Sequence, residues 1–254
     1  MLKLMKYEFR KNAMGLAIML GLAAGMFVLA PLGRALEKEE LMFISLFMLF
    51  VYAFAAYVFV LVRGITAYSG ELRGRTGYLL MMVPRSTMCI LFGKLLFTLF
   101  FALLMLAVSV IALVASGGIL LGELYEVRGI IDAFRILLLS NGINPVSISS
   151  AALFFAAQIL TSILTLVAMG YLAVTLSATV LQSGKLRGLL SFVFFAALVA
   201  LTERVQSFVR PDVEIFETYE NALRAAAPVM LLDLALTCGF TALSAVLLKK
   251  KVSL

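Results

Sequence analysis

Six long apolar stretches divide the chain, and this pattern constrains the fold more than any other feature of the sequence. A helix of about 20 apolar residues is long enough to cross the hydrocarbon layer of a bilayer. Of the 254 residues, 63% are hydrophobic and only 14% are charged, which is too little polar surface for a soluble protein. We therefore expect an all-α integral membrane protein with six transmembrane helices and a single transmembrane domain over residues 1–254. The predicted spans are residues 13–32, 41–62, 95–122, 149–181, 188–204 and 225–248.

The charged residues between these stretches predict the topology. Fourteen Lys and Arg residues lie on the side of the membrane that holds both termini, and seven lie on the other side. Loops rich in Lys and Arg stay in the cytoplasm. The N- and C-termini and the segment 63–94 are therefore expected to be cytoplasmic. On the outer side, residues 124–138 show helical periodicity and predict an amphipathic helix, whereas residues 205–224 fit either a re-entrant helix or a solvated loop.

Composition also excludes several kinds of function. The net charge of +7 is spread over short segments beside apolar stretches rather than gathered in one patch, so no nucleic-acid partner is expected. Histidine is absent, which removes histidine metal ligands and histidine bases. Cys89 and Cys238 are not expected to form a disulfide.

The N-terminal segment "MLKLMKYEFRKN" places apolar and basic residues on adjoining helical stripes. The apolar stripe consists of Leu2, Met5 and Phe9. The basic stripe consists of Lys3, Lys6 and Arg10. An amphipathic helix on the inner membrane surface is expected, and it fits two roles equally well: a connecting helix that transmits force, or a basic anchor to anionic lipid.

The segment 63–94 between the second and third spans is strongly basic, with Glu71 as its only acidic residue. Residues 78–83 form an apolar patch that is too short to span, and Pro84 ends any helix that precedes it. We expect a short helix that lies flat on the cytoplasmic surface, with its charged end toward another protein.

The local sequence "GELRGRTGYLLMMVPRS" followed by "GKLL" resembles the inner loop of ABC-2 type permeases, the membrane subunits of ATP-binding cassette exporters. Many members have Glu-Arg before the Gly-Thr step, where this chain has Leu72 to Gly77. The order of six spans and an amphipathic N-terminus is similar along the whole chain. On this resemblance, the residues of the loop that couples to the ATPase are Glu71, Arg73, Arg75, Thr76, Pro84 and Lys94.

The resemblance implies a permease subunit that forms a homodimer or heterodimer in a bacterial plasma membrane. A separate cytoplasmic ATPase would hold ATP and magnesium and would power export of an amphiphilic peptide, drug or lipid-like substrate. The resemblance further implies a translocation path beside the second and fifth spans. The aromatic residues there are Phe54, Tyr57, Phe192 and Phe195.

The chain itself is not expected to be an enzyme or to bind a cofactor. It lacks the GxxxxGK[ST] phosphate-binding pattern, because Met88 occupies the position of the first glycine before Gly93 and Lys94. A secondary transporter is the main alternative, because Asp233 lies inside the sixth span and an intramembrane carboxylate is a functional candidate by default. An immunity or sensing subunit is a third possibility.

Overall fold

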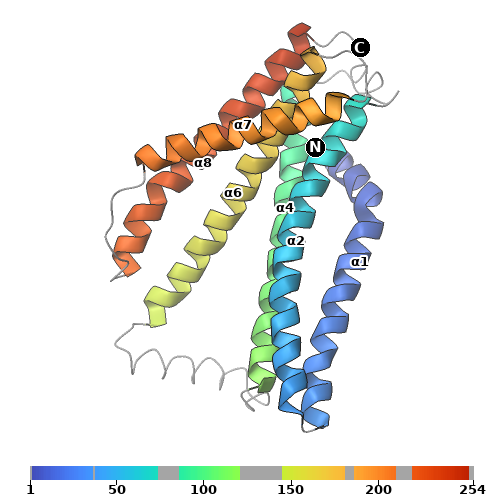
Figure 1. The fold of residues 1–254 in the computed structure, drawn as a ribbon, viewed down its shortest axis with the longest axis vertical. Helices are drawn as coiled ribbons and strands as arrows, with labels where there is room; N and C mark the ends of the chain where they lie inside the picture. The colour runs from blue at the N-terminus through green and yellow to red at the C-terminus, as the bar shows by residue number, and fades with distance from the viewer. Residues whose placement is uncertain are drawn as a thin grey trace. The chain divides into compact units, whose positions relative to one another are not determined.

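The computed structural model of the protein describes residues 2–36, 38–73, 86–120, 145–180, 186–209 and 219–251. These residues are helical apart from short connections (Figure 1). In chain order the helices are α1 (Leu2–Ala35), α2 (Glu39–Arg73), α4 (Thr87–Leu120), α6 (Pro145–Val180), α7 (Leu186–Val209) and α8 (Tyr219–Lys251).

All six helices are long and apolar enough to cross a membrane. A helix is favoured in such a segment because it satisfies every internal backbone hydrogen bond without water. The prediction of a multi-pass, all-helical membrane protein is confirmed at this level for the described residues. The predicted outer helix at residues 124–138 lies outside them.

The helices that flank the predicted coupling loop are longer than the sequence suggested. Helix α2 continues past the predicted end of its span at Val62 to Arg73, and α4 begins at Thr87, before Lys94. Residues 63–73 and 87–94 are therefore helical rather than part of a loop, and residues 74–85 lie outside the described part of the chain. The sequence prediction ended each span at a charged residue, whereas Glu71 and Lys94 pair with each other and are accommodated inside the helices.

Two other boundaries differ from the predicted ones. The predicted N-terminal helix is continuous with the first span, because α1 runs unbroken from Leu2 to Ala35. The segment 205–224 is helical at both ends, where it belongs to α7 up to Val209 and to α8 from Tyr219 onward. Residues 210–218 lie outside the described ranges.

The chain divides into two compact units. The first unit contains Met1–Met5, Val60–Phe100 and Ala157–Leu254, and therefore includes all of α7 and α8. The second unit contains Lys6–Phe59 and Phe101–Ala156. Helices α1, α2, α4 and α6 each contribute residues to both units.

In the first unit, α2 packs closely against α6. Gly64 lies beside Val167, whose Cγ2 would be 3.1 Å from a Cβ at the glycine. The rings of Tyr68 and Tyr171 have centroids 4.6 Å apart, and the Tyr68 hydroxyl is 2.8 Å from Thr175 Oγ1. Small residues allow such close helix approach in membranes, where packing and hydrogen bonds replace the hydrophobic effect as the main cause of helix association.

In the second unit, side chains of α2 join α1 and α4. Ser45 donates a hydrogen bond to the carbonyl oxygen of Met26 in α1 at 3.0 Å. Phe59 of α2 packs against Phe101 of α4 with ring centroids 6.0 Å apart. These contacts join α1 and α4 to α2 within the unit.

Candidate functional site

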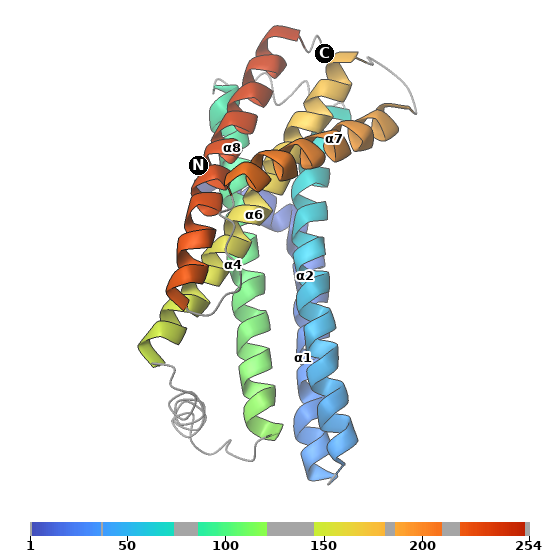
Figure 2. The same ribbon diagram turned by 60° about the vertical axis from the view of Figure 1, so that its left-hand side comes forward.

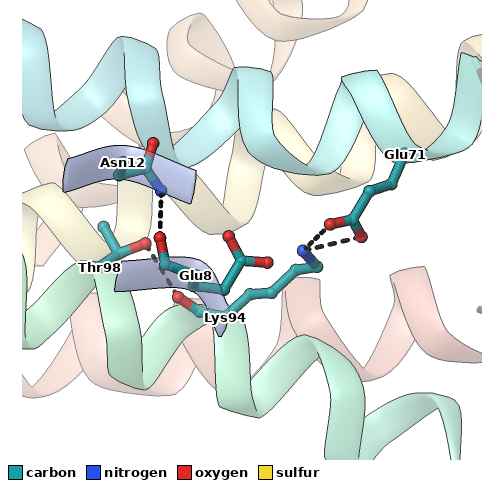
Figure 3. A network of polar contacts seen from close by, with 5 residues as sticks. All are labelled: Glu8, Asn12, Glu71, Lys94 and Thr98. Carbon is teal, nitrogen blue, oxygen red and sulfur yellow. Dashed lines mark hydrogen bonds and ion pairs between the residues drawn. The ribbon is translucent and has the colours of Figure 1, made fainter. Parts of the chain in front are cut away.

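A buried ion pair joins α2 to α4 in the first unit. Lys94 Nζ lies 2.8 Å from each carboxylate oxygen of Glu71, 23 positions earlier in the chain (Figure 3). Glu71 is 8% exposed and Lys94 is 3% exposed. Because water screens the pair so little, attraction and desolvation are both large, and removing one partner is costly.

The ion pair fixes the positions of two residues of the predicted coupling segment. Glu71 and Lys94 lie near the ends of α2 and α4 that flank residues 74–85, and they face each other. Arg73 is the last residue of α2. The remaining predicted coupling residues, Arg75, Thr76 and Pro84, lie outside the described residues.

The predicted N-terminal stripe lies on the first turns of α1. The backbone of Lys3 and Lys6 is helical, and the Arg10 side chain is exposed. Glu8 is only 2% exposed, and its carbonyl oxygen accepts a hydrogen bond from Asn12 Nδ2 at 3.0 Å (Figure 3). This part of α1 therefore carries a buried carboxylate in addition to the basic residues that the sequence emphasised.

A second buried polar cluster lies in the first unit around Asp233 of α8, which is 1% exposed. Gln206 of α7 donates from Nε2 to Asp233 Oδ1 at 2.6 Å. Thr165 of α6 donates to the Asp233 carbonyl oxygen at 3.1 Å and lies 3.0 Å from Thr237 Oγ1. Three helices thus meet at Asp233: α7 at its carboxylate and α6 at its backbone carbonyl oxygen.

The cluster continues along one face of α8. Four polar residues recur there at steps of three or four positions and are all buried, as expected for one helical stripe. They are Asp233, Thr237, Thr241 and Ser244. The hydroxyl groups donate to carbonyl oxygens one turn earlier in the same helix. The stripe is therefore polar, but each of these hydroxyl protons already has a hydrogen-bond acceptor within α8.

The aromatic residues expected along a translocation path have unequal exposure. Phe54 of α2 is 72% exposed and Phe192 of α7 is 71% exposed, whereas Tyr57 and Phe195 are half-buried. The pair on α2 belongs to the second unit and the pair on α7 to the first. An exposed aromatic face on a membrane helix is equally suited to lipid contact and to a path.

Sequence reasoning selected Asp233 but missed the residues around it. Gln206 was assigned to an outer segment, and only the continuation of α7 to Val209 brings it to the carboxylate. Two signals were available in the sequence: Thr237 follows Asp233 by one helical turn, and Gln206 follows Thr202 by one turn. Each spacing places polar residues on a shared face.

Neither cluster has the composition of a metal site. Among the residues that the structure describes, no group of three or more His, Cys, Asp or Glu side chains could hold a metal ion. In the comparisons with known proteins, no family model, curated protein or solved structure matches the chain. A functional assignment therefore depends on the residues and their geometry.

Proposed function

We propose that the protein is the permease subunit of an ABC exporter of the ABC-2 type, works as a dimer in a cell membrane, and is driven by a separate cytoplasmic ATPase subunit. Its substrate class is amphiphilic: a peptide, a drug or a lipid-like molecule. The chain contributes the path and the coupling surface, while ATP and magnesium bind to the partner.

The observation that carries the proposal is the Glu71–Lys94 ion pair. It ties the end of α2 to the start of α4, and the segment between these helix ends has the sequence that resembles a permease coupling loop. A loop that receives force from another protein needs a stiff base. Two helices joined by a buried bidentate ion pair provide one, because separating the charges in a low-dielectric interior is costly.

In this proposal, ATP-driven closure of the ATPases pushes on residues 74–85. The ion pair makes the adjoining parts of α2 and α4 move together, so a local push becomes a helix displacement. Rigid-body shifts of packed helices are a common way to convert a local event into a change of access. Arg73 and Arg75, one at the helix end and one beyond it, are the proposed charged contacts with the ATPase.

Co-expression with a candidate ABC ATPase from the same genome tests the proposal. We expect the soluble ATPase to co-purify with the membrane protein, and the chain alone to show no ATP hydrolysis. The double variant Arg73→Glu/Arg75→Glu should be inserted normally but lose the ATPase. Glu71 is left unchanged because reversing its charge would disrupt the pair with Lys94 and confuse folding with binding.

A matched control reverses a charge at the predicted outer surface. Lys38→Glu should retain the ATPase, because Lys38 is exposed and lies in the loop between α1 and α2. If the Arg73/Arg75 double variant retains the ATPase, the proposal that this segment binds and couples to the ATPase is wrong.

A secondary transporter is the second candidate, and the cluster around Asp233 favours it. A buried carboxylate that contacts an amide and lies among hydroxyl groups is the type of site at which carriers bind a coupling ion. Reconstitution of the chain alone in proteoliposomes separates the two candidates. Transport driven by an ion gradient without an ATPase, and lost in Asp233→Asn, would favour the carrier.

A further inference from the structure

Helix α7 is attached to its neighbours in an unusual way. All of its residues are described, and the two that are buried, Thr202 and Gln206, are both polar. Only 6% of the residues in the apolar stretch of α7 are buried, compared with 61% of those in the apolar stretch of α6. In two views α7 crosses α8 rather than running alongside it (Figures 1 and 2).

Polar contacts of Ser191, Thr202 and Gln206 join α7 to α6 and α8. At the start of α7, Ser191 lies 2.5 Å from Ser177 of α6. In its second half, Thr202 donates to the sulfur of Met169 at 3.8 Å, which is a weak contact. Near its end, Gln206 donates to Asp233 of α8 at 2.6 Å.

The membrane environment makes these polar contacts decisive. Lipid tails solvate an apolar helix face as well as another helix does, so apolar residues of α7 gain little from docking. The hydroxyl of Thr237 donates to the Asp233 carbonyl within α8 and stays satisfied whether or not α7 is docked. The Gln206 amide, in contrast, loses its acceptor on α8 when α7 leaves, and a polar group without a partner is costly in an apolar environment.

We propose that α7 is a displaceable gate helix and that the Gln206–Asp233 hydrogen bond is its latch. The gate opens when α7 separates from α8 and Gln206 leaves Asp233, and it closes when Gln206 again reaches Asp233. Opening removes the contact that Gln206 makes with the buried Asp233 carboxylate. This inference goes beyond the proposed permease role, because it concerns the chain alone and requires no ATPase.

A thiol placed at the opposite end of α7 from the latch tests the inference. Ser177→Cys is introduced into a background in which Cys89→Ser and Cys238→Ser remove the native thiols. Ser177 is 0% exposed and lies beside Ser191, about 22 Å along α7 from Gln206 at 1.5 Å per residue. The purified chain in lipid nanodiscs is treated with N-ethylmaleimide, and the rate of modification is followed by intact mass.

Gln206→Met removes the latch while keeping a side chain of similar length. If α7 opens as a rigid helix, the introduced thiol should react about 3- to 20-fold faster, the factor expected from the measured range of interhelical hydrogen bonds in membranes. Asp233→Asn keeps an acceptor oxygen for Gln206 and should react at the parent rate. Ser207→Leu, at the exposed position next to the latch, should also leave the rate unchanged.

A second reporter distinguishes gate opening from general loosening. Thr98→Cys, in the same background, places a thiol at a position of α4 that is 2% exposed, and its rate should not respond to Gln206→Met. An unchanged rate at position 177, or an equal increase at positions 177 and 98, would overturn the latch. If Gln206→Met cannot be purified, Gln206→Asn provides the same readout, because its amide is one methylene too short to reach Asp233.

Discussion

Gly170 of α6 lies against Ile65 of α2 so closely that no side chain fits between them. A Cβ at position 170 would lie 2.5 Å from Ile65 Cγ1 and 2.7 Å from its Cδ1, well inside van der Waals contact. The crossing of α2 and α6 in the first unit therefore depends on the absence of a side chain at this position. Ile65 belongs to the part of α2 that the sequence prediction had assigned to a loop.

Gly170→Ala should destabilise the protein by about 1–3 kcal/mol, the usual cost of overpacking a filled interior. The midpoint of thermal unfolding in detergent measures the effect. Gly239→Ala in α8 is the matched control, because a Cβ there would meet nothing within 4 Å and alanine favours a helix more than glycine does. Equal effects of the two substitutions would contradict the close crossing.

The Glu71–Lys94 pair predicts a strongly non-additive double-mutant cycle. Glu71→Leu alone or Lys94→Met alone should cost about 3–5 kcal/mol, because each leaves an opposite charge buried. The double variant Glu71→Leu/Lys94→Met should be close to the parent or more stable, since it removes both desolvated charges. Thermal unfolding of the four proteins measures the coupling, and Glu40→Gln, at an exposed position, should have little effect. Additive losses would show that the two residues do not stabilise each other.

Tyr68→Phe should weaken the contact between α2 and α6. Thr175 donates its own proton to the Tyr171 carbonyl oxygen at 2.6 Å, so the Tyr68 hydroxyl must be the donor in the 2.8 Å contact with Thr175 Oγ1. Loss of this bond should cost about 0.6–1.5 kcal/mol. Tyr52→Phe provides the comparison, because the Tyr52 hydroxyl meets only the Met105 sulfur at 3.8 Å. Denaturant titrations should rank Tyr68→Phe as the more harmful change, and the reverse order would contradict this assignment.

Thiol labelling of intact cells tests the predicted topology. In a background without native cysteines, Glu39→Cys should react with an impermeant maleimide added outside, because Glu39 lies in the predicted outer loop between the first two spans. Arg75→Cys should react only after the cells are opened, because the basic segment between α2 and α4 is expected in the cytoplasm. Labelling of Arg75→Cys in intact cells would place this segment outside and would contradict the predicted orientation of the whole chain.

The sequence alone determined the class of the protein, the number of membrane-spanning helices in the described residues, and their order. Long apolar stretches have one main solution in a bilayer, because a helix satisfies its own backbone hydrogen bonds. The sequence also singled out Asp233, because charged residues are rare inside such stretches. These conclusions need only local composition and periodicity, so they did not depend on knowing how the helices pack.

The tertiary structure decided where the helices end and what each buried charge contacts. Helix α2 continues through Glu71 because Lys94, 23 positions away, forms an ion pair with the Glu71 carboxylate, and no local pattern contains that information. Asp233 looked isolated in the sequence, yet packing brings it Gln206 from α7, 27 positions earlier, and Thr165 from α6, 68 positions earlier. A buried polar group is stable only with partners, and partners distant in sequence become neighbours only when the helices pack.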